Sequence, residues 1–219
     1  MKKDTLLART GRDPARYQGM VNTPVFRTST VIFPDHETYE ARGGDDYKKV
    51  RYGLSGTPTT FALEEAVAQM EGGHAAVALP SGLAAIAVAL WAFLKTGDHL
   101  LVPDPVYAPT RAFCDRRLKP NGIEVEYYDP LVGAGIGKLL KRNTRAVFCE
   151  APGSLTFEMQ DIPAIAAAAH ARGLPVLADT TWGTPYFFRS FEKGVDALGQ
   201  QGLFEGRIAG HARLHRVLE

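Results

Sequence analysis

The stretch that decides the fold is AAVALPSGLAAIAVALWAFLKTGDHLLVP, residues 75–103. A short apolar run at 75–79 ends in Pro-Ser-Gly at 80–82. If residues 83–95 form a helix, that helix is apolar on nearly every side. Residues 99–103 form a second apolar run after a glycine. This order predicts a strand, a buried helix and a second strand, which is the repeating unit of parallel sheets.

The same alternation continues along the chain. Helical spacing predicts helices at 61–72, 107–118, 136–141 and 162–172, and apolar runs predict strands at 123–128, 145–150 and 175–179. Strands separated by helices imply right-handed βαβ units. We therefore predict an α/β fold, with a mostly parallel sheet and helices on both faces. Residues 21–33 read as extended chain.

The pattern stops after Asp196. Residues 197–202 show no clear period, and residues 207–219 are rich in arginine and histidine. A parallel sheet that ended here would expose an edge and a face. We therefore predict a sheet that is incomplete at its C-terminal side. The expected parts are an extended N-terminal arm at 1–56, a partial large domain at 57–196 and a divergent tail at 197–219.

Composition indicates an ordinary globular protein. The 219 residues carry a net charge of +1, which gives no sign of a nucleic-acid or membrane surface. The longest apolar run, 83–94, is too short to span a membrane, and no secretory h-region follows the N-terminus. Cys114 and Cys149 lie far apart in apolar settings, which favours buried thiols over a disulfide. These features predict a cytoplasmic protein.

Two strand-to-helix junctions are candidate binding sites. Ser81-Gly82 stands where a strand ends and the buried helix begins, so unpaired N–H groups there would suit a phosphate. Many such turns carry Ser-Gly for conformational reasons alone. Tyr107 follows another predicted strand, where an aromatic ring either stacks on a flat ligand or packs in the core.

Asp179 ends the apolar run 176–178 and so lies at the carboxyl end of a strand. Ligands of open α/β sheets bind at that edge, and a carboxylate there can hold a protonated ring nitrogen. The alternative is that Asp179 caps the following segment through Thr180 and Thr181. The sequence alone leaves both interpretations open.

Other motifs carry less chemistry. The glycines of 133–137 follow a strand, but Lys138 stands where a dinucleotide fingerprint needs its last glycine. His211 and His215 have the spacing of a zinc pair, yet no glutamate stands beside the first one. We predict no metal site.

Taken in order, these segments resemble the pyridoxal-phosphate (PLP) enzymes of Cys/Met metabolism. The similar segments are 21–30, 51–53, 56–59, 80–85, 104–107 and 179–182, and the resemblance runs from about residue 4 to residue 196. Residues 150–158, EAPGSLTFE, are similar to the Glu-Ser-Pro-Gly-Ser-x-Thr segment of cystathionine β-lyases. The resemblance therefore implies a carbon–sulfur β-lyase that cleaves cystathionine to homocysteine, pyruvate and ammonia.

The resemblance also implies roles for single residues. Ser81, Gly82 and the backbone of Leu83 would bind the cofactor phosphate, and Tyr107 would stack on the pyridine ring. Asp179 would keep the ring nitrogen protonated.

A further residue links the site to oligomerisation. Tyr52 would reach the phosphate of a neighbouring subunit, which implies a homo-oligomer acting on a small amino-acid substrate, without nucleic acid or membrane.

Three departures from the family pattern are tolerable: Leu54, Ala151 and Thr180 stand where many members carry arginine, serine and asparagine.

The fourth departure concerns the lysine that holds the cofactor in this family. After residues 194–196 the family continues to that lysine, whereas Lys193 is the last lysine of this chain. We expect the family's small C-terminal domain to be missing as well. We expect a truncated or frame-shifted, inactive product with no catalytic residue in place. The alternatives are a non-catalytic fragment or interaction subunit of an intact homologue, and an unrelated nucleotide-binding domain.

Overall fold

A computed structural model of the chain describes residues 2–43, 48–200 and 203–206. The chain divides into two compact units, Met1–Met70 and Glu71–Glu219. The first unit contains the helices α1 (Lys3–Arg9) and α2 (His36–Glu40), the 3-10 turn η1 (Gly53–Ser55) and most of α3 (Pro58–Glu71). Residues 21–33 form neither helix nor strand.

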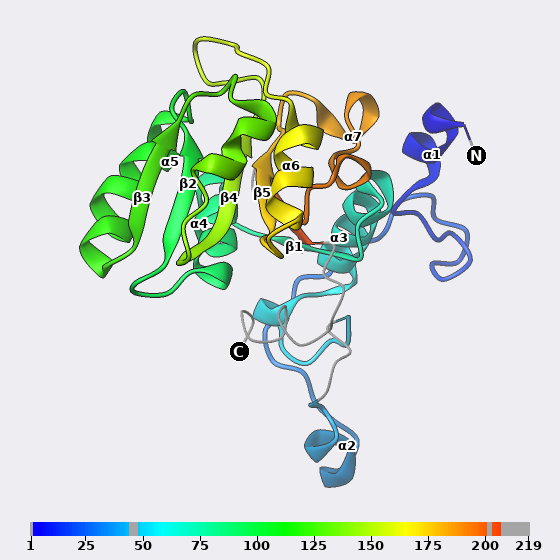
Figure 1. Cartoon of the computed structure of the whole chain (residues 1–219). Helices are drawn as coiled ribbons and strands as arrows, with labels where there is room; N and C mark the ends of the chain where they lie inside the picture. Colours follow the sequence, from blue (N-terminus) through cyan, green and yellow to red (C-terminus); the bar gives the residue numbers. More distant parts are fainter. Residues whose placement is uncertain (1, 44–47, 201–202, 207–219) are drawn as a thin grey trace. The chain divides into compact units, whose positions relative to one another are not determined.

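The second unit is built on a seven-stranded sheet (Figure 1). Its strands are β1 (Ala75–Ala78), β2 (His99–Pro103), β3 (Glu124–Tyr128), β4 (Thr144–Glu150), β5 (Val176–Asp179), β6 (Ala197–Gln200) and β7 (Leu203–Gly206). They lie in the order β1-β7-β6-β5-β4-β2-β3. β7 runs antiparallel to both of its neighbours, and the remaining pairs are parallel.

Helices cover both faces of this sheet, which confirms the predicted fold class (Figure 1). The helical elements are α4 (Gly82–Phe93), α5 (Ala108–Phe113), η2 (Cys114–Leu118), η3 (Lys119–Asn121), η4 (Gly133–Lys138), α6 (Ile162–His170), α7 (Thr184–Phe187) and η5 (Ser190–Lys193). Within the described residues, none of these helices is long and apolar enough to cross a membrane.

The core has two halves, one on each face, because successive side chains of a strand point to opposite sides. Leu100 of β2 belongs to the same half of the core as Leu90 of α4. Leu101, the next residue, belongs to the other half, together with Ile165 of α6. Each face of the sheet is thus buried by its own set of helices.

Two predicted helices differ from those in the structure. The helix expected over 107–118 is α-helical only to Phe113 and continues as a π-helical turn to Leu118. The helix expected at 136–141 is a 3-10 helix over Gly133–Lys138. Glycine has low helix propensity, and Gly133, Gly135 and Gly137 favour this tighter turn over a full α-helix.

The sheet continues past Asp196, where the sequence shows no period. Residues Ala197 and Leu198 pair with β5, and β7 fills the place between β6 and β1. Asp196 binds the start of β5 directly before this pairing begins. Its N–H donates to the Val176 carbonyl and its carboxylate accepts from the Val176 N–H, each at 2.8 Å. β5 is therefore not the exposed edge that the loss of pattern predicted.

Candidate cofactor pocket

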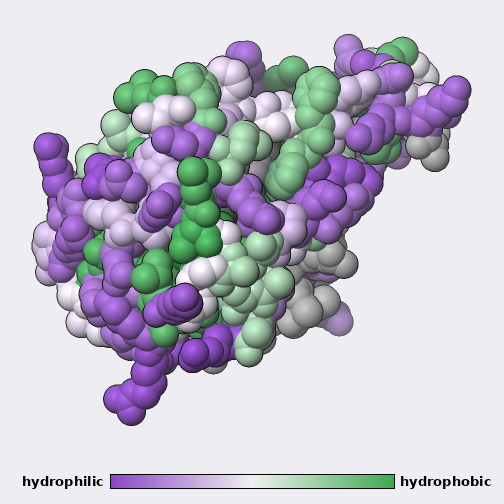
Figure 2. All heavy atoms as spheres, turned by 45° about the horizontal axis from the view of Figure 1, so that its top comes forward, coloured by the Kyte–Doolittle hydropathy of each residue, from purple (hydrophilic) through white to green (hydrophobic). Residues whose placement is uncertain are grey.

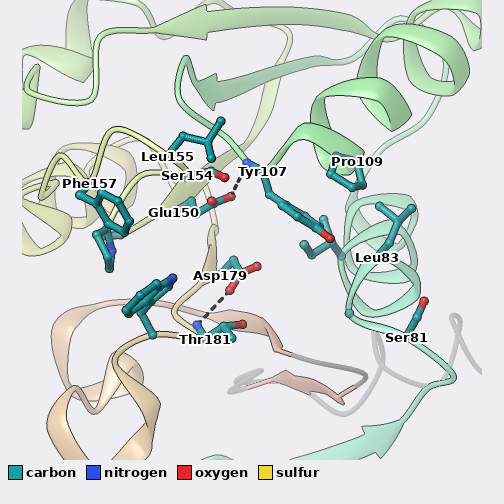
Figure 3. Close-up of a pocket in the computed structure, with 15 residues that line it drawn as sticks. Ser81, Leu83, Tyr107, Pro109, Glu150, Ser154, Leu155, Phe157, Asp179 and Thr181 are labelled. Atoms are coloured by element: carbon teal, nitrogen blue, oxygen red, sulfur yellow. Dashed lines mark hydrogen bonds between the residues drawn. The ribbon is translucent and has the colours of Figure 1, made fainter.

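A pocket of about 740 Å³ opens at the carboxyl ends of β4 and β5 (Figure 3). Those strands end side by side, with Glu150 in register with Asp179. The starts of α4 and α5 form the opposite wall. Of the six residues predicted to bind a cofactor, five line this pocket: Ser81, Gly82, Leu83, Tyr107 and Asp179.

The start of α4 is suited to an anion. Ser81 caps the helix, because its Oγ accepts a 3.1 Å hydrogen bond from the N–H of Ala84. Gly82 and Leu83 follow in the first turn, where N–H groups have no partner within the helix, and both residues line the pocket. The positive end of the helix dipole adds to this preference for negative charge.

Asp179 lies deep at the end of β5. One carboxylate oxygen accepts a 2.9 Å hydrogen bond from the N–H of Thr181, so the capping interpretation holds for that oxygen. The other points toward the cavity (Figure 3). Burial raises the pKa of this carboxyl group, because a charged group loses its hydration there. A ligand that donates a charged N–H would relieve that cost.

Tyr107 stands on the pocket wall rather than in the core. Its side chain is 45% exposed, and its ring faces the cavity (Figure 3). The N–H of Tyr107 donates to Oε2 of Glu150 at 2.9 Å. The ring therefore projects from a backbone position that is fixed by the end of β4.

Glu150 is a pocket residue that the sequence did not identify as a site residue. Its side chain is buried, and this burial raises its pKa to about 7, with the nearby charge of Asp179 adding to the rise. Glu150 ends a predicted apolar strand, as Asp179 does, and this position could have identified it as a pocket residue. The sequence analysis used Glu150 only as the first residue of the segment that resembles β-lyases.

The segment after β4 forms the outer rim of the pocket. Leu155 and Phe157 have positive φ angles of 67° and 61°, and the Phe157 ring meets Trp182 edge to face at 5.6 Å. These three side chains are exposed. The face of the molecule that is turned forward in Figure 2 shows hydrophobic residues lying among hydrophilic ones. A flat aromatic ligand would find further apolar contacts along this rim.

Other candidate residues lie elsewhere. Tyr52 belongs to the first unit, where Ser29 Oγ donates to its hydroxyl at 3.3 Å, so its role toward a cofactor stays a prediction. His211 and His215 lie outside the described residues. The glycines of 133–137 form a 3-10 helix that packs through Ile136, not a phosphate loop.

Comparison with known proteins identifies the chain's relatives. The family model described as Cys/Met metabolism PLP-dependent enzyme matches residues 4–202. A Rhizobium johnstonii protein provisionally named cystathionine beta-lyase is 51% identical over 193 residues, which are 88% of this chain and 48% of that protein. Cystathionine beta-lyase MetC of Escherichia coli is 37% identical over 202 residues, covering 89% and 50% of the two chains.

A solved structure agrees with these sequence matches. The crystal structure of metB from Corynebacterium glutamicum superposes with a TM-score of 0.86 at 26% identity and covers 100% of this chain and 57% of that one. The chain thus spans about half the length of the relatives it matches.

Proposed function

Because the chain belongs to the Cys/Met metabolism family of PLP-dependent enzymes, we propose that it is the cofactor-binding part of a carbon–sulfur β-lyase that cleaves cystathionine. Homocysteine, pyruvate and ammonia would be the products. The names of the relatives and the EAPGS segment that begins at Glu150 support this choice within the family. We place the protein in the cytoplasm as a homo-oligomer, without a nucleic-acid or membrane partner.

The chemistry of the pocket fits PLP at three points. The first turn of α4 offers N–H groups to a phosphate, and the exposed face of Tyr107 offers a stacking surface to a pyridine ring. Asp179 offers a buried carboxylate to the ring N–H. The position of Asp179 carries the proposal, because a buried carboxylate that lines the pocket is stabilised by a cationic donor of this kind.

Each residue then has a definite task. Asp179 would accept the hydrogen bond of the ring nitrogen and hold the proton on that atom. Tyr107 would keep the ring in place and exclude water from one of its faces, while Glu150 fixes the backbone of Tyr107. PLP, when bound, supplies an electron sink for the negative charge that develops at the substrate Cα.

The covalent attachment of the cofactor is a separate question. Lys193 lies in η5 before the start of β6, and residues 197–219 contain no lysine. We therefore propose that this chain binds PLP without a covalent bond and does not turn over cystathionine by itself. Its β-lyase chemistry would need a lysine supplied in the family's position.

Titration with PLP tests the binding step. Quenching of the fluorescence of Trp182, which lines the pocket, should saturate at one equivalent. Asp179→Asn should weaken binding about tenfold or more, because it removes a charge-assisted hydrogen bond. The matched control is Asp129→Asn, in a surface turn, which should leave binding unchanged. Equal affinity of wild type and Asp179→Asn would overturn the proposal, as would a borohydride-fixed adduct on Lys193.

A chimera tests the reaction. Residues 1–196 would be joined to the C-terminal half of the Escherichia coli relative, which brings its own lysine-bearing segment. We expect this chimera to release pyruvate from cystathionine, and its Asp179→Asn variant to release far less. A chimera that binds PLP but forms no pyruvate would refute the β-lyase assignment.

A further inference from the structure

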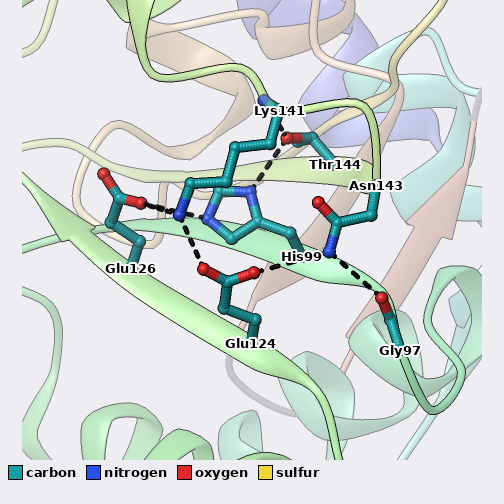
Figure 4. Close-up of polar contacts among 7 residues, drawn as sticks. All are labelled: Gly97, His99, Glu124, Glu126, Lys141, Asn143 and Thr144. Carbon is teal, nitrogen blue, oxygen red and sulfur yellow. Dashed lines mark hydrogen bonds and ion pairs between the residues drawn. The ribbon is translucent and has the colours of Figure 1, made fainter.

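A second polar cluster lies where β2, β3 and β4 begin (Figure 4). The pocket lies at the opposite, carboxyl end of the strands. His99, Glu124 and Thr144 are the first residues of these three strands. The register places His99 beside both Glu124 and Thr144. The cluster is therefore built by the sheet itself and is separate from the proposed cofactor site.

His99 is the buried centre of this cluster. Its side chain is fully buried, and its Nδ1 lies 2.8 Å from the Oγ1 of Thr144. Its Nε2 is buried too and makes no hydrogen bond within the part of the chain that the structure describes. The nearest carboxylate oxygen, Oε2 of Glu126, lies 3.4 Å from it. Thr144 thus fixes the ring so that Nε2 faces the carboxylates.

Glu124 and Glu126 are two residues apart on β3, so their side chains project from the same face. One carboxylate oxygen of each and one ring nitrogen of His99 all lie within 4.8 Å of one another. The ammonium of Lys141 binds at the same place, 2.6 Å from Glu124 and in contact with Glu126. A cation is thus already held between these carboxylates.

We propose that His99, Glu124 and Glu126 form a Zn²⁺ site for which the ammonium group of Lys141 competes. One imidazole nitrogen and two carboxylates suit Zn²⁺ better than Mg²⁺ or Ca²⁺, which prefer oxygen ligands alone. Water would complete a four-coordinate shell. Lys141 can leave, because its side chain is 41% exposed.

The surroundings resemble the outer shell of a metal site. Thr144 orients the imidazole through Nδ1, as hydrogen-bond partners of metal-bound histidines commonly do. Asn143 lies between the Gly97 carbonyl and Glu124, to which its Nδ2 donates at 3.1 and 3.4 Å. A bound ion would tie the starts of β2 and β3 together and stabilise this edge of the sheet.

Calorimetric titration of the full chain with Zn²⁺ tests this proposal. All variants would carry His211→Ala and His215→Ala, because that pair has the spacing to bind zinc on its own. We expect one equivalent to bind. Glu126→Gln should weaken binding about tenfold or more. Lys141→Met should strengthen it about tenfold, since a competing positive charge is removed.

Lys138→Met is the matched control, because it removes a lysine that is close to Lys141 in sequence but lies outside the cluster, and it should leave the affinity unchanged. Replacing buried His99 risks misfolding, so the two glutamates and Lys141 carry the test. The proposal is overturned if Lys141→Met binds no Zn²⁺, if Glu126→Gln binds as tightly as its parent, or if Lys138→Met tightens binding as much as Lys141→Met.

Discussion

The buried carboxylate of Glu150 accepts a 2.9 Å hydrogen bond from the backbone N–H of Tyr107, so the end of β4 fixes the start of α5. This bond joins two walls of the pocket. Burial raises the pKa of Glu150 to about 7, the Tyr107 hydrogen bond opposes that rise, and the charge of Asp179 adds to it. The protonation state of this link therefore changes near neutral pH.

Glu150→Gln should remove a pH-dependent loss of stability. The folded state holds a proton on Glu150 up to a pKa of about 7, whereas the unfolded state releases it near the ordinary value of 4.5. Unfolding free energy contributed by this group therefore falls as pH rises from about 4.5 to about 7. Glutamine keeps an acceptor for Tyr107 without the charge, so the variant should be more stable than wild type at pH 8 by roughly 1–3 kcal/mol.

Urea unfolding at a series of pH values from about 4 to about 8 measures this difference, since the linkage applies across that window. The two proteins should agree at the acid end and diverge toward the alkaline end. Glu192→Gln, at an exposed ion pair with Arg189, is the control and should follow wild type at every pH. Parallel curves for Glu150→Gln and wild type would mean that the buried carboxyl does not titrate as described.

The sequence predicted the layered α/β fold because its signals are local. The strand at His99–Pro103 has the predicted bounds, since a short apolar run between Gly97-Asp98 and Asp104-Pro105 is readable without its neighbours. Asp179 and Ser81 were found for the same reason, because each stands at the end of a readable element.

The remaining features depend on contacts between distant residues. Polar and glycine residues interrupt the apolar pattern of β6 and β7, and their pairing with β5 and β1 comes from the sheet. Glu150 becomes a pocket residue only through its register with Asp179 and its bond to Tyr107. His99 meets Glu126 only because β2 and β3 are neighbours, and no spacing in the sequence reveals that.

Tyr128→Phe should destabilise the protein and loosen the pocket rim. The Tyr128 hydroxyl is buried and lies 2.9 Å from both the Phe148 carbonyl and Oε1 of Gln160. The amide of Gln160 in turn donates to the Glu150 carbonyl at 2.8 Å. Removing the hydroxyl leaves a buried acceptor without its donor, which costs about 1–2 kcal/mol in urea unfolding.

Tyr127→Phe is the matched control one residue earlier. That hydroxyl reaches Asp115 at the surface at 3.0 Å, so its loss should cost less than about 0.5 kcal/mol. Hydrogen exchange should also quicken over residues 150–160 in Tyr128→Phe and not in Tyr127→Phe. Equal effects of the two variants would show that the buried network does not hold the rim.

Gly53→Ala should disrupt the first unit. A Cβ at Gly53 would lie 1.8 Å from the carbonyl oxygen of Thr28, a distance that the backbone has to relieve by moving. That movement would break the 2.7 Å hydrogen bond from the Gly53 N–H to the Ser29 carbonyl and displace the adjacent Tyr52. Limited proteolysis within residues 1–70 should become markedly faster. Gly43→Ala, where a Cβ meets nothing within 4 Å among the described residues, should be cut as slowly as wild type.

The two cysteines should be unreactive in the folded protein. Cys114 and Cys149 are fully buried, and burial raises the pKa of each thiol to about 12, so little of the reactive thiolate exists at pH 8. A thiol-specific disulfide reagent should label neither residue until urea unfolds the chain, after which both should react. Fast labelling of the native protein would contradict this burial. The two thiols also belong to core halves on opposite faces of the sheet, so they cannot pair with each other in the folded chain.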